Sequence, residues 1–407
     1  MVILILKKLS IFLIICSICT ISSCSNTIYA YEDIDFEIVM EPGDMQIYKP
    51  VDPPRISVPA AVAIDTTNGR ILFGKNAFTQ RQMASTTKMM TAILAIENGN
   101  LSDQVKVSSR AARIRGSQAQ LKEGEMLTLE NLLYALMLPS GNDAAIAIAE
   151  HFGGSVENFI TMMDAKARQV GAVNTKYGSP HGLDRENYST AYDLAIIAKY
   201  CIQNSLFSKI VNTKSKVIPR AGMEDGKQYN NTNEMLRSYE GADGVKTGYT
   251  GPAGRCLVSS ATRNDWRVVC VVLGANSKQQ RHDESKKILD YCFGSFPLNT
   301  VLEKEQEVIS IPVIKGTKEW AYIINKQELK MHIQDSELVK LDREFIVPKV
   351  ITAPIKEGQT AGKLVFKLDD KEVGTSELFF KESILFRTVD VNFIRLINYL
   401  LKREFIK

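Results

Sequence analysis

Two segments typical of β-hairpins enclose a long helical region, and this order constrains the fold more than any other feature. Residues 58–75 contain two apolar runs around an Asn-Gly pair, which favours a two-residue turn. Residues 254–275 repeat the arrangement around a turn at 263–265. We therefore expect one α+β domain over residues 56–297, in which strands distant in sequence share an antiparallel sheet flanked by helices.

The region between the hairpins has apolar residues at helical spacing, separated by turn signals. A Pro-Ser-Gly break at 139–141 interrupts one long helical pattern and divides it into two helices. One further helix is expected after the second hairpin. The expected helices cover residues 85–98, 128–151 with the break, 155–170, 190–204 and 281–292.

The pattern of apolar residues changes after Pro297. Residues 300–387 contain short β-branched and alternating runs, which predict a small all-β domain. Residues 388–407 then predict an amphipathic helix with a single apolar stripe. That helix either packs on its own domain or lies in a membrane interface, and we favour the membrane. The stripe consists of Phe393, Leu396, Ile397, Leu400 and Leu401.

The N-terminus indicates export from the cytoplasm. Two lysines precede an apolar run at about 9–21, and small residues follow, as in a signal peptide spanning residues 1–30. The run is short for a permanent transmembrane anchor, which is the alternative. Cleavage after Ala30 would release a soluble chain, whereas a lipoprotein-type signal would end in lipidation of Cys24. Residues 31–55 are acidic and then proline-rich, which is typical of a linker.

Composition excludes several classes of function. The formal net charge is only +4, from 50 Lys and Arg against 46 Asp and Glu, so no broad basic surface for nucleic acid is expected. The 4 histidines and the scattered cysteines form no ligand cluster, so neither a metal nor another cofactor is expected. The cysteines outside the N-terminal segment are expected to be buried small hydrophobic residues rather than disulfide partners. They are Cys201, Cys256, Cys270 and Cys292.

Three short motifs carry the chemistry: Ser-Thr-Thr-Lys at 85–88, Ser-Gly-Asn at 140–142 and Lys-Thr-Gly at 246–248. Each motif alone is weak, but the three in this order, in an exported chain, are strong. A serine hydroxyl needs a base to become a nucleophile. Ser85 and Lys88 are three residues apart and share a helix face, so Lys88 can serve as that base.

Lysine acts as a base only when it is neutral. Burial and a second cation both favour the neutral form, and Lys246 can be that cation. The positive end of the helix, including the N–H of Ser85, can stabilise a developing oxyanion. Ser140 can relay a proton to a leaving amine, and Asn142 can hold both Lys88 and a substrate amide.

The third motif is expected to bind substrate. Lys246 and Thr247 can hold a terminal carboxylate, and Gly248 lets substrate backbone approach the strand closely. A strand at the edge of the sheet would also accept an extended peptide by backbone pairing. All three motifs are therefore expected to converge at one site.

The motifs make the chain resemble the low-molecular-mass penicillin-binding proteins, which are serine-type D-alanyl-D-alanine carboxypeptidases. The likeness covers the signal, the catalytic domain, the β domain and the terminal helix. It extends to the segments at 108–125, 179–195, 231–236 and 241–254. The resemblance implies a serine β-lactamase/penicillin-binding-protein fold, peptidoglycan stem peptides as substrates and β-lactam antibiotics as inhibitors.

The resemblance also implies residue roles. Ser85 would be acylated by the penultimate D-alanine carbonyl of a stem peptide, which releases the terminal D-alanine, and water would then hydrolyse the acyl-enzyme. Penicillin would acylate Ser85 by the same route and leave slowly. Tyr249 would supply a second backbone N–H to the oxyanion, and Arg281 would meet the substrate carboxylate. His181 could be mistaken for a base, but we expect it to order its loop.

Three alternatives stay open. A class A β-lactamase would need a glutamate in a Glu-x-x-x-Asn-type loop, but here Glu186 is directly followed by Asn187. A transpeptidase or endopeptidase of the same fold would use the same residues. An inactive wall-binding scaffold would be expected to lack at least one motif residue, and none is missing.

Overall fold

The computed structural model describes residues 52–388 and residue 393. The expected signal peptide and most of the expected linker lie outside the described residues. So does the expected C-terminal helix, apart from residues 388 and 393. The predictions for these segments therefore stay predictions.

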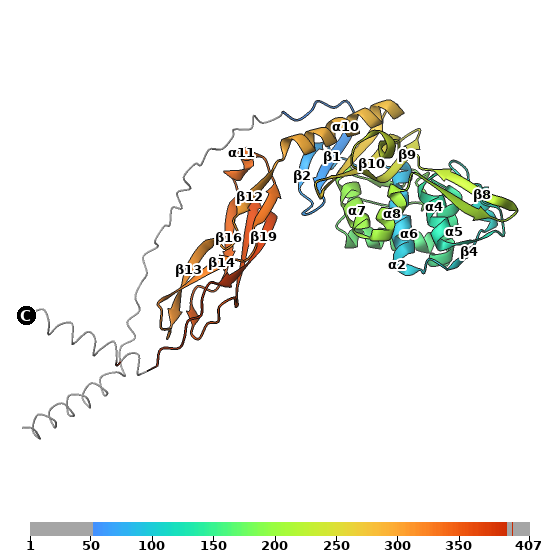
Figure 1. Cartoon of the computed structure of the whole chain (residues 1–407). Helices are drawn as coiled ribbons and strands as arrows, with labels where there is room; N and C mark the ends of the chain where they lie inside the picture. The colour runs from blue at the N-terminus through green and yellow to red at the C-terminus, as the bar shows by residue number, and fades with distance from the viewer. Residues whose placement is uncertain (1–51, 389–392, 394–407) are drawn as a thin grey trace, which may run out of the picture. The chain divides into compact units, whose positions relative to one another are not determined.

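A five-stranded antiparallel sheet has the strand order β2-β1-β11-β10-β9 (Figure 1). Both predicted hairpins are confirmed, and they share this sheet: β1 pairs with β11, for example Ala63 with Cys270. The second hairpin turns through Asn264 and Asp265, both with positive φ. The strands are β1 (Ala60–Asp65), β2 (Ile71–Lys75), β9 (Ala242–Thr250), β10 (Gly254–Arg263) and β11 (Trp266–Ala275).

Successive residues of each strand face opposite sides of the sheet, as the pleat requires. In β1, Ala61 and Ala63 belong to the core beneath helix α10 (Lys278–Ser295). Their neighbours Val62 and Ile64 belong to the larger core among the remaining helices. The sheet is thus buried on both faces, which explains why its central strands read as continuous apolar runs.

The predicted helices are confirmed within a few residues. The break at 139–141 separates α4 from α5, and Ser or Thr side chains cap several helix N-termini. The longer helices are α2 (Lys88–Asn98), α4 (Leu129–Met137), α5 (Asn142–Gly153), α6 (Val156–Gln169), α7 (Ala191–Gln203), α8 (Ser205–Asn212) and α10. The shorter ones are η1 (Ala84–Thr87), α3 (Ser109–Arg113) and α9 (Met235–Ser238).

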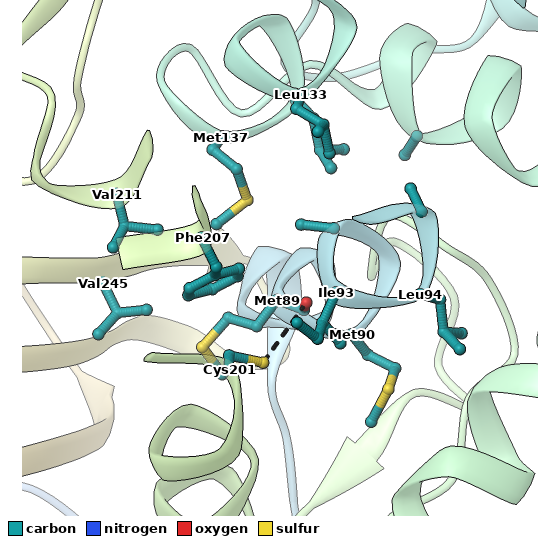
Figure 2. Packing of buried hydrophobic residues seen from close by; sticks show 14 of the residues in the cluster. Met89, Met90, Ile93, Leu94, Leu133, Met137, Cys201, Phe207, Val211 and Val245 are labelled. Atoms are coloured by element: carbon teal, nitrogen blue, oxygen red, sulfur yellow. Dashed lines mark hydrogen bonds between the residues drawn. The ribbon is translucent and has the colours of Figure 1, made fainter. Parts of the chain in front are cut away.

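Helix α2 runs through the middle of the larger core. Its residues from Lys88 to Ala95 are all buried. Figure 2 shows Met89 and Ile93 of α2 among side chains from α4, α7, α8 and β9. Cys201 packs there with its thiol 3.8 Å from the Met89 carbonyl oxygen. All four cysteines among the described residues are buried and free, as expected.

The expected helix start at the first motif is confirmed, and the structure shows its type. Ser85 lies in the 3₁₀ helix η1, and α2 follows directly from Lys88. The hydroxyls of Thr86 and Thr87 bond back to the carbonyl oxygens of Met83 and Ala84, which stabilises the tighter turn. Side chains three residues apart are eclipsed in a 3₁₀ helix, so the expected proximity of positions 85 and 88 is kept.

Helix α8 and several polar strands were not predicted, although Asn204 caps α8 and its apolar residues lie on one face. The hairpin of β7 (Ser215–Arg220) and β8 (Met223–Asn230) is mostly polar, and its few buried positions, Ile218, Arg220 and Tyr229, do not form an apolar alternation. The other short strand pairs are β3 (Arg81–Gln82) with β6 (Tyr188–Ser189) and β4 (Gln104–Lys106) with β5 (Met126–Thr128).

The C-terminal region is all-β except for a single helical turn, α11 (Asp335–Leu338). A six-stranded sheet has the order β16-β18-β19-β14-β13-β17, and β12 pairs with β15. Its separate core includes Ile323, Phe366 and Phe380. The strands are β12 (Leu298–Leu302), β13 (Glu307–Ile314), β14 (Trp320–Asn325), β15 (Leu329–His332), β16 (Asp342–Ile346), β17 (Ile351–Thr352), β18 (Thr360–Leu368) and β19 (Lys371–Phe380).

Candidate active site

The side chains of Ser85 and Lys88 are in direct contact. Lys88 Nζ lies 3.0 Å from Ser85 Oγ, 2.7 Å from Asn142 Oδ1 and 3.0 Å from the carbonyl oxygen of His181. All three acceptors are uncharged groups. The lysine side chain is completely buried because it opens the helix that lies at the centre of the core.

The surroundings of Lys88 favour its neutral form. Burial lowers the pKa of Lys88 well below its usual range, and the positive charge of Lys246 lowers it further. Asp143 acts in the opposite direction but does not outweigh them. A neutral amine beside a serine hydroxyl can accept the hydroxyl proton, which is the requirement for a general base.

The second motif forms the turn between α4 and α5. Asn142 is the first residue of α5, and its amide nitrogen donates to the carbonyl oxygen of Arg115 at 2.7 Å, which aims its oxygen at Lys88. Ser140 adopts a left-handed conformation with φ of 65° and is buried. No hydrogen-bond partner of its hydroxyl is found among residues 52–388. A buried hydroxyl without a partner is available to a substrate.

Asp143 is a buried carboxylate that sequence reasoning missed. It accepts hydrogen bonds from the backbone N–H groups of Ala119, Leu121 and Ala144 at 2.9–3.0 Å. The segment 115–121 is therefore fastened to the start of α5, where it also holds Asn142. The only signal in the sequence was an acidic residue in the first turn of a helix, a common feature of helices without catalytic roles.

The same segment is held from its other side by a buried ion pair. Arg220 donates to Glu125 at 2.5 and 2.7 Å and to the carbonyl oxygens of Ala119 and Gln120 at 3.1 and 2.7 Å. Burial raises the pKa of Glu125, but the hydrogen bond and charge of Arg220 outweigh it, so the pKa is lowered. The hairpin β7–β8, which carries Arg220, thus supports the site indirectly.

The third motif lies on β9, an edge strand of the five-stranded sheet. A Cβ atom at Gly248 would lie only 3.0 Å from the backbone nitrogen of Ser85 and 3.1 Å from the carbonyl oxygen of Met83. Glycine therefore allows β9 to run against the turn that carries Ser85. This close approach brings the first and third motifs together, as the sequence predicted.

Lys246 is buried to 1% exposure, and its Nζ lies 3.0 Å from the Thr247 carbonyl oxygen. Burial lowers the pKa of Lys246 to about 7, and the positive charge of Arg281 contributes. Arg281 itself is buried on α10, with Nη1 3.5 Å from the Cys256 carbonyl oxygen. Its Nε has no hydrogen-bond partner within the described part of the chain. Two buried cations with spare donors suit an anionic group of a substrate.

Tyr249 follows the third motif and is 57% exposed. The guanidinium of Arg255, its cross-strand neighbour on β10, lies 4.3 Å from the centre of the tyrosine ring. The side chain of Tyr249 therefore lines the surface next to the motif rather than entering the group around Lys88.

His181 contributes to the site through its backbone. Its carbonyl oxygen accepts from Lys88, while its ring Nδ1 accepts from the backbone N–H of Leu183 at 3.2 Å. Burial lowers the pKa of His181 to about 4, so the ring is neutral at physiological pH. Gly182 adopts φ of 88°, and a Cβ atom there would lie 2.0 Å from the Ala84 carbonyl oxygen. The loop is thus ordered around the histidine and packed against η1.

A buried serine–lysine pair, a Ser-Gly-Asn turn and a Lys-Thr-Gly edge strand on a sheet covered by helices define the class of active-serine proteins that includes serine β-lactamases and penicillin-binding proteins. Comparison with family models identifies the family within this class. The one described as D-alanyl-D-alanine carboxypeptidase matches residues 48–277, and the one described as penicillin-binding protein 5, C-terminal domain, matches residues 296–385. The chain belongs to the peptidase S11 family of D-alanyl-D-alanine carboxypeptidases.

Individual relatives agree with this assignment. D-alanyl-D-alanine carboxypeptidase DacF of Bacillus subtilis is 34% identical over 332 residues, which cover 80% of this chain and 85% of the relative. Penicillin-binding protein 5 from Haemophilus influenzae superposes with a TM-score of 0.67 at 30% identity, over 82% of this chain and 99% of that one. The Streptomyces K15 DD-transpeptidase gives 0.58 at 37% identity, over 60% of this chain and 100% of its own.

Proposed function

We propose that the protein is a serine-type D-alanyl-D-alanine carboxypeptidase that trims peptidoglycan stem pentapeptides during cell-wall maturation. The observation that carries the proposal is the contact between Ser85 and a buried Lys88 whose acceptors are all uncharged. The family membership and the names of the relatives support the choice of substrate.

In the proposed reaction, Ser85 Oγ attacks the carbonyl carbon of the penultimate D-alanine and passes its proton to Lys88 Nζ. The backbone N–H groups of Ser85 and Tyr249 stabilise the oxyanion. The bond to the terminal D-alanine then breaks, and its nitrogen takes a proton from Lys88 through the hydroxyl of Ser140. Water, deprotonated by Lys88, finally hydrolyses the ester on Ser85 and restores both side chains.

Substrate binding is assigned to the edge strand. The peptide lies along β9 beside Gly248, and its amide contacts Asn142. The terminal carboxylate is held by Lys246, Thr247 and Arg281, whose burial strengthens charge-assisted hydrogen bonds. A β-lactam carries a similar carboxylate and a reactive carbonyl, so it acylates Ser85 and inhibits the enzyme.

The test is release of free D-alanine from a pentapeptide that ends in D-Ala-D-Ala. We expect release by the wild-type protein and none by Ser85→Ala, with equal circular dichroism spectra for the two proteins. Mass spectrometry after incubation with benzylpenicillin should show an adduct on the peptide that contains Ser85. Rapid, repeated turnover of nitrocefin without a lasting adduct would instead indicate a β-lactamase.

A transpeptidase is the second candidate, because one similar structure is described as a DD-transpeptidase at 37% identity. That chain covers only 60% of this one, whereas the penicillin-binding protein 5 C-terminal model matches residues 296–385 here. We therefore favour hydrolysis. Adding an amine acceptor such as glycylglycine to the assay separates the two, since a transpeptidase would form the aminolysis product in excess over the hydrolysed peptide.

We further propose that the protein is exported and bound to a membrane surface by residues 388–407. The apolar stripe of that segment and the adjoining exposed Leu385 and Phe386 support this placement. Among the described residues, no helix is long and apolar enough to cross a bilayer.

A further inference from the structure

Thr232 is an exposed residue whose hydroxyl oxygen lies 2.7 Å from the hydroxyl oxygen of Thr247. Either oxygen can be the donor in this contact. Thr247 belongs to the Lys-Thr-Gly motif, whereas Thr232 lies in the connection between β8 and α9. None of the roles proposed above for the three motifs involves Thr232.

The backbone around Thr232 is fixed on both sides. Asn231 donates through its side-chain nitrogen to the carbonyl oxygens of Val211 and Thr213 at 3.2 and 3.0 Å. Asn233 donates in the same way to the Gly244 carbonyl oxygen of β9 at 2.7 Å. Both asparagines are buried, so they anchor the segment while the residue between them faces outward.

The backbone of Thr232 is fixed as well. Its N–H donates to the carbonyl oxygen of Leu138 at 3.2 Å, directly before the turn that contains Ser140. The Thr232 backbone is therefore held against two elements of the site, which limits where its hydroxyl can lie relative to Thr247. Such a fixed arrangement is what a preorganised binding group requires.

We propose that Thr232 is a positioning residue that directs the hydroxyl proton of Thr247 toward the terminal carboxylate of the substrate. A hydroxyl has one proton to donate and two lone pairs. When Thr232 donates to Thr247, the proton of Thr247 is left for another acceptor. A carboxylate can only accept hydrogen bonds. It therefore binds to Thr247 when Thr232 donates to Thr247, and not when Thr247 donates to Thr232.

The inference rests on the proposed function, and it adds a specificity device to it. Thr232 improves recognition of an anionic substrate end without touching that end. A substrate with an esterified end lacks the anionic acceptor, so it gains little from the direction of the Thr247 proton. Loss of the Thr232 hydroxyl should therefore weaken recognition of a substrate with a free carboxylate more than recognition of its ester.

The experiment compares acylation by benzylpenicillin with acylation by benzylpenicillin methyl ester, followed by mass spectrometry. Thr232→Val keeps the shape of the side chain and removes the hydroxyl. We expect roughly a 3- to 10-fold fall in the second-order rate constant for benzylpenicillin, the size of one hydrogen bond. The rate constant for the methyl ester should stay within about twofold of the wild-type value.

Two further variants serve as controls. Thr232→Ser retains the hydroxyl and should keep the wild-type ratio between the two compounds. Thr161→Val makes the same chemical change on the exposed face of α6 and should change neither rate. With the pentapeptide, Thr232→Val should raise KM and leave kcat nearly unchanged, since the carboxylate contact exists before and during the reaction.

Equal rates for Thr232→Val and wild type with benzylpenicillin would overturn the inference and leave the proposed function intact. An equal fall with both compounds would also overturn it, because it would indicate a purely structural role. A wild-type protein that benzylpenicillin does not acylate would remove the proposed function and the inference together.

Discussion

Lys88 and Lys246 are two buried lysines in one site, and the charge of Lys246 lowers the pKa of Lys88. Neither forms an ion pair with a carboxylate among the described residues (4 Å or less between nitrogen and oxygen). The site thus contains two lysines, and the proposed chemistry requires one of them, Lys88, to be neutral.

Replacing Lys246 by Met should move the pH profile of acylation. Burial is the larger cause of the low pKa of Lys88 and remains, but the second positive charge is lost. The pKa of Lys88 then rises, so the neutral base appears only at higher pH. We expect the acid limb of the benzylpenicillin acylation rate to shift upward in pH, whatever the change in maximal rate. An unshifted limb would contradict a role for Lys246 in keeping Lys88 neutral.

The same variant should change how stability depends on pH. The pKa of Lys246 is about 7 when folded and near 10.4 when unfolded, so the unfolded chain binds more protons between these values. Wild-type stability should therefore rise from pH 7 toward pH 10, and Lys246 disfavours folding most below pH 7. Lys246→Met should be more stable than wild type at pH 6, on the order of several kcal/mol at most, with the advantage shrinking toward pH 10. Urea unfolding at several pH values measures this difference.

Arg220 should matter for stability and for acylation together. Arg220→Met leaves Glu125 buried without its partner, which costs about 3 kcal/mol. Replacing both residues by apolar ones of similar size should regain part of that loss. Acylation of Ser85 should slow in Arg220→Met, because the segment 115–121 that holds Asn142 loses its support. Strictly additive losses in a double-mutant cycle would argue against a coupled pair.

His181→Asn should leave the shape of the pH profile unchanged. The pKa of His181 is about 4, and its ring accepts from Leu183, a bond that an asparagine oxygen can replace. We expect a moderate change in rate from altered packing but no loss of a titrating limb between pH 5 and 8. Disappearance of a limb in that range would make the ring itself a participant.

Removal of residues 388–407 should release the protein from lipid vesicles. In the full chain, Leu396→Ser together with Leu400→Ser should weaken cosedimentation with anionic vesicles about as strongly, because each change removes apolar burial at the interface. Asn398→Ser, outside the stripe, is the matched control and should bind as wild type does. Undiminished binding by the shortened chain would place the membrane contact elsewhere.

The fold was predictable where apolar periodicity was strong. The hairpins at both ends of the catalytic region and the break before Asn142 followed from turn residues and spacing. The hairpin that carries Arg220 did not, because its strands are mostly polar and the few buried side chains on its inner face include the charged Arg220. Alternation marks a half-buried strand only where the buried positions are apolar.

The candidate site was predictable where residues act through side chains in short motifs. Ser85, Lys88, Asn142 and Lys246 come together as expected. The carbonyl oxygen of His181 was not predictable as a partner of Lys88, because every residue has a carbonyl and only the fold selects one. The same holds for backbone N–H groups that bind Asp143.

Glycine at 248 illustrates a third case. From the sequence, a glycine at this position was expected to let the substrate backbone approach the strand. The structure shows a second reason, because a side chain there would crowd the turn that carries Ser85. Packing between segments distant along the chain sets this requirement, and no local pattern records it.

The pairing of β1 with β11 has a consequence for biogenesis. During synthesis, β1 is made long before its partner β11. The sheet therefore cannot close until the catalytic region is nearly complete. Late closure of the sheet is compatible with the proposed export of the chain in an unfolded state.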